Sequence, residues 1–249
     1  MTGDLTAPCP EHRIPEHSPV LSIIVPMLNE AGSLPDLLAH LTRVREQIGS
    51  HRCDVLLVDG GSRDDSVAIA TQAGFRVVPS ARGRARQMNT GAQHTQGHLL
   101  LFLHADTRLP EQPHQVIEPL LQHHLSPLWG RFDVTISGDA LMLTVIATLI
   151  NLRSRLSGIA TGDQAMFVSR TLFDHVGQFP DQPLMEDIEL SKRLKRQQRP
   201  HCLRAQVHTS GRRWLQHGVW RTIFLMWRLR WAYWRGAPAE QLAKEYNKT

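Results

Sequence analysis

Acidic and glycine-rich clusters follow several apolar runs in this chain, and such residues could bind a metal ion together with an anionic substrate. The segment Leu99–Thr107 is the clearest case, because its apolar run stops at His104, Ala105 and Asp106. A continuous apolar run is typical of a strand buried on both faces of a parallel sheet, and ligands bind at the carboxyl ends of such strands. Asp106 could therefore bind a metal ion, or it could cap the next helix through local hydrogen bonds.

Three similar clusters precede this segment. A carboxylate at a strand end can accept a hydrogen bond from a base or a ribose hydroxyl, and glycine lets the backbone approach a flat ring. Glycine and cations at a helix N-terminus favour an anion, because free backbone N–H groups and the helix dipole point toward it. Each cluster alone is also typical of a tight turn, a helix cap or a solvated basic surface. The clusters contain Pro26, Asn29 and Glu30; Asp59 and Gly60; and Gly83, Arg84, Gln87 and Asn89.

The elements that must position these clusters follow from the hydrophobic pattern, in which strands alternate with helices. This alternation predicts an α/β fold with a parallel sheet covered by helices. Apolar residues recur at three- and four-residue steps after Ser33, as expected for an amphipathic helix with an N-cap. The predicted strands are Leu21–Val25, Asp54–Val58, Arg76–Val78, the apolar run from Leu99, and Trp129–Ile136; the predicted helices include Leu34–Ile48, Ser66–Ala73, Arg84–Thr95 and Pro113–His124.

The composition narrows the class of protein. A chain of 249 residues can bury a core as one domain or two. Its net charge of +5 favours anionic partners, but basic residues are scattered among acidic ones without a nucleic-acid motif, so we expect no nucleic-acid partner. Cys9, Cys53 and Cys202 form no metal-binding pattern, which favours a reducing compartment, the cytoplasm. Residues 1–19 are polar and lack a signal-peptide core, and we expect a disordered lead-in.

Two apolar segments could contact a membrane. Ala140–Leu152 is shorter than the roughly 20 residues of a spanning helix, which predicts a buried or interfacial helix. Val219–Trp234 mixes aromatic residues with arginines, and each charge would cost about 2.5–3.5 kcal/mol at a bilayer centre, which argues against a spanning helix. This segment could lie on a membrane surface. Its aromatic residues also recur at helical spacing, and we expect that stripe to pack on the domain.

Taken in order, the clusters resemble family 2 glycosyltransferases of the GT-A fold over residues Val20–Trp214. The matching motifs are Pro26-x-x-Asn29-Glu30, Asp59-Gly60-Gly61-Ser62-x-Asp64, Gly83-Arg84-x-x-Gln87-x-Asn89 and His104-Ala105-Asp106. The resemblance implies a mostly parallel central sheet with helices on both faces, plus C-terminal helices. It also implies a catalytic domain at 20–214, with a nucleotide-sugar-binding half at 20–110 and an acceptor half at 111–214. Residues 215–249 would form an aromatic and basic helix and tail.

The resemblance further implies roles in binding a nucleotide-sugar donor. It makes Asp106 the ligand of a divalent ion, Mn²⁺ or Mg²⁺. The chain departs from the family's Asp-x-Asp motif at His104, which stands at the first acidic position. These hard ions prefer oxygen ligands, so we assign the metal to Asp106 alone and a donor contact or a supporting role to His104. The donor-binding residues implied are Pro26, Asn29, Glu30, Asp59, Gly60, Gly83, Arg84, Gln87, Asn89, His104, Ala105 and Asp106.

Glycosyl transfer with inversion also needs a base for the acceptor hydroxyl. Glu186 and Asp187 fall at a predicted helix start, where carboxylates are stabilised, although a capped surface helix has the same pattern. The resemblance favours Asp187 as the base, with Glu186 orienting it. By the same resemblance, the segment Gly162, Asp163 and Gln164 contacts the sugar or the acceptor.

Arg212 and Arg213 follow a glycine and precede a predicted helix start. Arginine can pair with a diphosphate through two hydrogen bonds, so this loop could fold over the donor; it could also be a basic helix cap. The sequence as a whole predicts a metal-assisted, inverting glycosyltransferase that moves a sugar from a UDP-sugar to a small-molecule or lipid-linked acceptor. The alternatives are a polyprenol-phosphate glycosyltransferase peripheral at the inner face of the membrane and a nucleotide-sugar-binding module without catalysis. The chain looks most like the arsenosugar-biosynthesis type of this family, although its cysteines form no arsenic-binding cluster.

Overall fold

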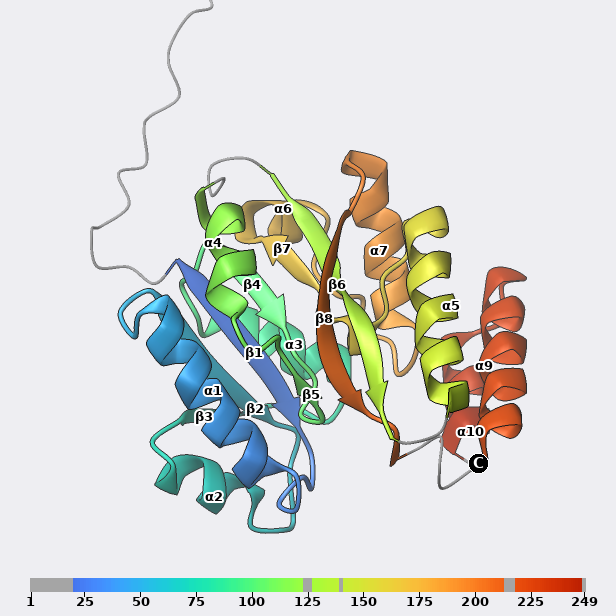
Figure 1. The fold of residues 1–249 in the computed structure, drawn as a ribbon. Coiled ribbons are helices and arrows are strands. Elements are labelled where there is room, and N and C mark those ends of the chain that lie inside the picture. Colours follow the sequence, from blue (N-terminus) through green and yellow to red (C-terminus); the bar gives the residue numbers. More distant parts are fainter. Residues whose placement is uncertain (1–19, 123–126, 139–140, 213–217, 248–249) are drawn as a thin grey trace, which may run out of the picture.

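A computed structural model describes residues 20–122, 127–138, 141–212 and 218–247. These residues form an eight-stranded sheet in the order β3-β2-β1-β4-β7-β6-β8-β5, with helices on both faces (Figure 1). The strands are β1 Leu21–Met27, β2 Cys53–Asp59, β3 Arg76–Pro79, β4 Leu99–Phe102, β5 Thr107–Arg108, β6 Trp129–Ser137, β7 Phe167–Ser169 and β8 His201–Ser210.

The two faces of the sheet are covered by different helices, because alternate residues of a strand point to opposite faces. Ile23 and Leu57 belong to the core under α1, α2 and α4, whereas Ile24 and Leu56 belong to the core under α3, α6 and α7. The predicted α/β architecture is confirmed. The helices are α1 Leu34–Ile48, α2 Ser66–Gln72, α3 Arg84–Gln93, α4 Pro113–Gln122, α5 Leu141–Ser157, α6 Arg170–His175, α7 Glu186–Gln197, α9 Val219–Trp234 and α10 Ala239–Asn247, with a short 3-10 helix at Gly162–Gln164.

The parallel strands β3, β2, β1 and β4 bring their carboxyl ends to one edge of the sheet. Met27 pairs with Asp59, and Ile24 pairs with Phe102, so the loops after β1, β2 and β4 leave the sheet close together. The strand that begins at Leu99 is shorter than predicted and ends at Phe102, which places the following loop at this edge. The pair β6–β8 is also parallel, whereas β7 runs antiparallel between β4 and β6.

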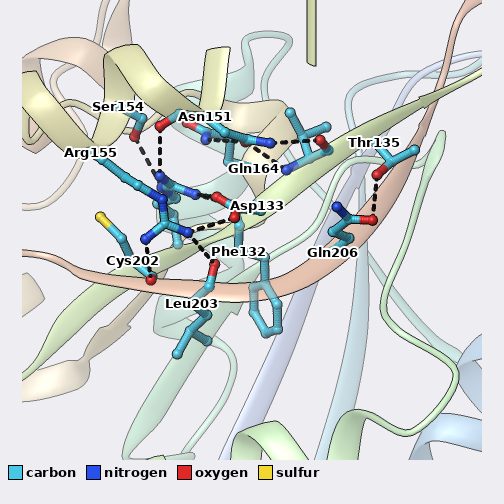
Figure 2. A network of polar contacts seen from close by, with 12 residues as sticks. Phe132, Asp133, Thr135, Asn151, Ser154, Arg155, Gln164, Cys202, Leu203 and Gln206 are labelled. Carbon is cyan, nitrogen blue, oxygen red and sulfur yellow. Dashed lines mark hydrogen bonds and ion pairs between the residues drawn. The ribbon is translucent and has the colours of Figure 1, made fainter. Parts of the chain in front are cut away.

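A buried ionic network fixes α5 to the second half of the sheet (Figure 2). Arg131 of β6 is fully buried and ion-pairs with Asp133, and its Nε donates to Ser154 Oγ of α5 at 3.1 Å. Arg155 of α5 binds the other oxygen of the same Asp133 carboxylate at 2.6 Å and the carbonyl oxygen of Cys202 in β8 at 3.0 Å. Two arginines therefore share one aspartate, and the charge of the buried guanidinium is paired as burial requires.

Asn151 of α5 continues this attachment. Its side-chain amide pairs with both the N–H and the C=O of Val134 in β6, at 2.9 and 3.0 Å, as a neighbouring strand would do. Its Oδ1 atom also accepts a 3.4 Å hydrogen bond from Gln164 Nε2 (Figure 2). The position of the 3-10 helix at Gly162–Gln164 therefore depends on α5.

The aromatic stripe of α9 faces outward, so the prediction that it packs on the domain is wrong. The buried side of α9 is aliphatic: Leu225 and Leu229 pack with Met185 and Ile188 around α7 and with Leu242 of α10. Because this aliphatic stripe packs against the rest of the protein, the aromatic stripe on the opposite side of α9 is exposed. The exposed fractions of Trp220, Phe224, Trp227, Trp231 and Trp234 range from 57 to 77%. Among the described residues, no helix is both long and apolar enough to cross a bilayer.

Candidate active site

A cavity of about 320 Å³ opens at the carboxyl ends of β1 and β4 and collects most of the predicted donor-binding residues. This is the edge of an open α/β sheet where ligands bind. The wall combines residues that the sequence indicated with others that it did not, which are Met27, Leu28, Arg82, Pro183, Leu184, Ala243 and Tyr246. The indicated residues on the wall are Pro26, Glu30, Gly83, Arg84, Gln87, His104, Ala105, Asp106 and Glu186.

A second and larger cavity, of about 490 Å³, lies at the opposite edge of the sheet, beside the start of β2. Arg76, which lines this cavity, already binds Asp54 and the carbonyl oxygen of His94. The predicted motif residues line the first cavity, which is therefore the candidate active site.

Arg84 and Glu186 face each other across the candidate site. Arg84 lies in the first turn of α3, and its Nη1 atom is 3.7 Å from Glu186 Oε1 at the start of α7. The Glu186 side chain is only 4% exposed, whereas that of Arg84 is 49% exposed. Burial, and then repulsion from Asp187, raises the pKa of Glu186 to about 7, although Arg84 acts in the opposite direction. The half-exposed guanidinium remains available to an anion in the cavity.

Asp106 presents its carboxylate on the cavity wall from a turn that is fixed at both sides. Thr107 Oγ1 donates to Asp106 Oδ1 at 3.2 Å, and Ser210 N–H of β8 donates to the Asp106 carbonyl oxygen at 3.1 Å. Among the described residues, no group of three or more His, Cys, Asp or Glu side chains could hold a metal ion. Mg²⁺ and similar ions are, however, commonly held by one or two carboxylates plus substrate phosphates. The residues fit an ion bound in that way, with Asp106 as its protein ligand.

His104, Gly162 and Asp187 connect three of the predicted segments. A Cβ atom at Gly162 would lie 2.3 Å from His104 Nε2, so the imidazole ring packs directly on the glycine backbone. The Gly162 N–H donates to Asp187 Oδ2 at 2.9 Å, and the Ile188 N–H donates to Asp187 Oδ1 at 2.7 Å. Glycine at 162 is thus required by a close approach, and the Asp187 carboxylate is held by two backbone N–H groups.

The His104 ring is neutral near pH 7. Burial, and after it the charge of Arg84, lowers the pKa of His104 to about 4, although the aspartates around the ring act in the opposite direction. Its Nε2 atom is buried and has no hydrogen-bond partner within the described part of the chain. This nitrogen lies against the Gly162 backbone, a contact that is compatible with the supporting role predicted for His104.

Several predicted donor residues lie beside the cavity rather than on its wall. The Asp59 carboxylate accepts N–H groups of Gly61 and Ser62 at 3.0–3.2 Å and so holds the turn after β2. Asn29 accepts the Arg63 N–H at 2.8 Å, which ties the loop after β1 to the same turn. Both side chains are engaged by backbone in this structure.

Gln87, Gly60 and Asn89 hold the strand ends and α3 in place. Gln87 Nε2 donates to the carbonyl oxygens of Met27 and Val58, each at 2.9 Å, and its amide lies 3.0 Å from where a Gly60 Cβ would be. The Asn89 side chain forms two hydrogen bonds with the backbone of Phe179, away from the cavity.

The remaining predicted residues lie in the 3-10 helix at Gly162–Gln164 and in the loop after β8. Gln164 is buried and forms a capping box with Thr161, while Asp163 beside it is partly exposed. Arg212 is exposed, and its Nη2 atom lies 3.9 Å from Oε2 of Glu30, which lines the cavity. Arg213 lies outside the described residues.

Sequence reasoning missed the contribution of α10. Residues assigned to a C-terminal tail form this helix, and its Ala243 and Tyr246 line the cavity. An amphipathic pattern around Leu242 and Ala243 was the available signal for a helix, but its place over the cavity depends on tertiary packing against α9 and the start of α7. Arg82 was missed although it stands two residues before Arg84.

The model of glycosyl transferase family 2 matches residues 22–172, which include the donor side of the cavity, whereas Glu186 and Asp187 lie beyond the match. An undecaprenyl-phosphate 4-deoxy-4-formamido-L-arabinose transferase of Pseudomonas syringae pv. syringae is 28% identical over 62% of this chain and 48% of its own length. An uncharacterized glycosyltransferase of Mycobacterium tuberculosis is 35% identical over 45% of each chain. The chain therefore spans about half the length of these relatives.

Solved structures share the fold at low sequence identity. S. aureus TarS 1–349 in complex with UDP superposes with a TM-score of 0.62 at 17% identity, covering 76% of this chain and 60% of that one. The mannosyltransferase PcManGT from Pyrobaculum calidifontis, in complex with GDP-Man and Mn²⁺, has a TM-score of 0.60 at 17% identity, covering 87% and 62%. The fold is that of GT-A enzymes, and because the family model spans more than half of the chain, this protein is a glycosyltransferase that belongs to glycosyl transferase family 2.

Proposed function

We propose that this glycosyltransferase uses a UDP-sugar as donor. The sugar is transferred with inversion to an acceptor oxygen, and UDP is the leaving group. The observation that carries the proposal is the presence of Arg84 and Asp106 on the wall of one cavity at the carboxyl edge of the sheet. A guanidinium and a metal-binding carboxylate are the groups that neutralise a departing diphosphate. The complexes of TarS with UDP and UDP-GlcNAc support the choice of uridine.

The divalent ion would be held by Asp106, with diphosphate oxygens as its other ligands. When bound, Mn²⁺ or Mg²⁺ supplies positive charge that stabilises the negative charge growing on the diphosphate. The Mn²⁺ in PcManGT supports this assignment. Arg84 would pair with the diphosphate from the start of α3, where free backbone N–H groups also favour an anion. Glu186, 3.7 Å from Arg84, would position that guanidinium.

The nucleoside would lie along Pro26 and Glu30, which line the same cavity. Asp59 and Asn29 would shape this part of the site, because they tie together the two loops that border it. Arg212 would approach the diphosphate from the loop after β8, where it already lies 3.9 Å from Glu30.

Asp187 would be the base that accepts the proton of an acceptor hydroxyl. Its two backbone hydrogen bonds fix the direction of the carboxylate, and each oxygen keeps a further lone pair. The Gly162–Asp187 hydrogen bond places Asp163 and Gly162 beside this base, on the side expected for sugar and acceptor. In the transfer, the acceptor oxygen forms a bond to the anomeric carbon while the bond from that carbon to the diphosphate breaks.

Two variants test these assignments in an assay that measures UDP release from UDP-sugars in the presence of Mn²⁺. Asp106→Asn and Asp187→Asn are each expected to lower turnover by about 10²-fold or more, since each removes one charge used in the transition state. Their thermal unfolding should stay close to that of the wild type. Near-normal turnover of either variant would contradict its assigned role. Tight UDP-sugar binding without any turnover by the wild type would indicate a binding module instead.

A second candidate, a lipid phosphate as acceptor, is favoured by Arg153 on α5. Its Nε and Nη2 atoms are buried and have no hydrogen-bond partner in the ranges that the structure describes. Burial, and after it the charge of Arg230, lowers the pKa of Arg153 to about 10, although Asp163 and Asp187 act in the opposite direction. A phosphate arriving at the acceptor side would supply the missing partner. The relative named for undecaprenyl-phosphate supports this acceptor class, whereas the arsenosugar type rests on sequence resemblance alone.

Arg153→Gln separates the two acceptor classes. With a short polyprenyl phosphate as acceptor, the variant should raise KM by about tenfold, as expected for the loss of one charge-assisted hydrogen bond. With the matching alcohol, its KM should be unchanged. Arg221→Gln, on the exposed side of α9, is the matched control. Equal effects of Arg153→Gln on both acceptors would reject the phosphate site.

A further inference from the structure

The outer sides of α5 and α9 carry an unusual concentration of exposed apolar residues. Outside these two helices, Val67 is the sole large apolar residue that is clearly exposed among the described residues. Monomeric soluble proteins rarely expose a large contiguous apolar patch unless it binds something. The residues of this surface, the α5–α9 face, are Leu141, Val145, Leu149, Leu152 and Leu156 of α5 and Trp220, Phe224, Trp227, Trp231 and Trp234 of α9, with exposed fractions of 45–81%.

The two helices form one surface because they pack against each other. Leu143 and Ile146 of α5 share a small apolar core with Val219 and Ile223 of α9 and with Ile136 of β6. Figure 1 shows both helices side by side at the end of the molecule that is formed by the second half of the chain. The leucine stripe and the tryptophan stripe therefore lie on neighbouring helices and not on opposite ends of the protein.

The two helices of this surface contribute only positive charges. Neither Leu141–Ser157 nor Val219–Trp234 contains an aspartate or a glutamate; of their five arginines, Arg155 pairs with Asp133, Arg228 pairs with Glu245 of α10, and Arg153 is partly buried. Arg221 is exposed beside the aromatic stripe, and Arg235, just after α9, stacks over Trp231 with its Cζ 4.8 Å from the ring centroid. Tryptophan and arginine beside aliphatic residues are the composition of helices that lie in the interface of an anionic bilayer.

We propose that the α5–α9 face docks this enzyme onto the surface of a membrane that contains anionic lipids. The leucines and tryptophans would enter the boundary between headgroups and acyl chains, and the exposed Arg221 and Arg235 would contact lipid phosphates. A second copy of the chain fits this surface less well, because a self-complementary contact would bring arginine against arginine. The proposal goes beyond the transfer reaction and does not depend on which acceptor is used.

Docking in this way would bring the catalytic side close to the bilayer. The inner side of α9 packs through Leu225 and Leu229 on Met185 and Ile188, the residues that flank Glu186 and Asp187. An α-helix with its side chains is about 10–12 Å across. The acidic pair would therefore lie about one helix diameter from the lipid surface, and Arg153 would lie on the helix that borders it.

Vesicle binding of the full chain tests the proposal. Phosphatidylcholine vesicles with and without phosphatidylglycerol are sedimented with the wild type, with Trp227→Ser and with Arg221→Glu. The wild type should bind the anionic vesicles, and high salt should weaken this binding. Arg221→Glu should lower the partition coefficient at least about fivefold, since one basic residue near an anionic surface contributes about 1 kcal/mol and the new carboxylate is repelled. Trp227→Ser should lower binding to a similar extent by removing an inserted ring.

Two matched controls keep the result specific. Arg43→Glu, at an exposed position of α1, and Val67→Ser, on α2, change the same chemistry outside the face and should bind like the wild type. UDP release in solution should be the same for all variants, so failure of docking and failure of the proposed reaction are distinguishable. Equal vesicle binding by face variants and controls would overturn the proposal. The proposal would also be overturned if the wild type did not bind anionic vesicles but formed a dimer, and Trp227→Ser disrupted that dimer. The face would then be a contact between two copies of the chain.

Discussion

At the scale of single residues, Glu186 and Arg84 show how burial and charge are balanced in the site. The carboxylic acid is nearly inaccessible, and the guanidinium 3.7 Å away is half-exposed to the cavity. A buried carboxylate with one partner is costly, which is why the pKa of Glu186 rises to about 7. The sequence identified both residues, but their pairing across α3 and α7 follows only from the fold.

Glu186→Gln is expected to change the pH dependence of stability. The folded-state pKa of about 7 lies above the ordinary value of 4.5, so the native state holds this proton more tightly than the unfolded state. The free energy of unfolding should therefore fall as pH rises from about 4.5 to 7, by about 1–3 kcal/mol. Glutamine mimics the protonated acid, and the variant should be more stable than the wild type at pH 8 but not at pH 4.

Urea unfolding at several pH values measures this difference. Glu189→Gln, a more exposed position of the same helix, is the control and should parallel the wild type. Wild-type and Glu186→Gln stabilities that stay parallel over the whole range would show that Glu186 titrates at its ordinary pKa.

Gly162→Ala tests the contact between the His104 ring and the backbone of the acceptor segment. The new Cβ would lie 2.3 Å from His104 Nε2, so either the ring or the segment must move. We expect a loss of about 1–3 kcal/mol in stability, as for overpacking elsewhere, and a fall in turnover because the same glycine N–H orients Asp187. The double variant Gly162→Ala with His104→Ala removes the clash. Its loss of stability should therefore be smaller than the sum of the losses in the two single variants. Additive losses would contradict this contact.

At the scale of elements, the first half of the molecule was predictable and the second only in part. The strands and helices from Leu21 to Phe102 follow a regular alternation, and their bounds agree within a few residues. Beyond β4, antiparallel β7 and the 3-10 helix are too short to leave a hydrophobic period. Their positions depend on long-range contacts such as the pairing of Leu100 with Val168. The aromatic stripe of α9 was misjudged because periodicity shows that one side of a helix is apolar, and α9 has two such sides.

Asn151→Ala tests the attachment of α5 to the sheet. The substitution leaves the N–H and C=O of Val134 without the amide that pairs with them, and it removes the contact to Gln164. Unsatisfied buried backbone groups cost about 1–3 kcal/mol, so the midpoint of urea unfolding should fall accordingly. Thr148→Ala, at an exposed position of α5, should have little effect. Equal stability of the two variants would indicate that water replaces the Asn151 amide.

At the scale of the whole molecule, one continuous sheet brings together the residues that we propose bind the donor and the acceptor. β4, from the half that carries the donor motifs, pairs with β7 from the second half, and α7 then presents Glu186 beside Arg84. The sequence motifs indicated which residue types meet, since ligands bind at the carboxyl edge of such a sheet. They could not indicate that α10 closes the cavity with Tyr246, or that α5 and α9 leave their apolar sides exposed.

The central claim is that Arg84 and Asp106 bind a uridine diphosphate with a divalent ion in the cavity at the carboxyl edge of the sheet. Calorimetric titration of UDP into the wild type, with and without Mn²⁺, measures this directly. We expect binding that Mn²⁺ strengthens by at least about tenfold, that Asp106→Asn makes independent of Mn²⁺, and that Arg84→Met weakens in both conditions. Arg43→Met should bind like the wild type. UDP binding that neither Asp106→Asn nor Arg84→Met affects would contradict the site.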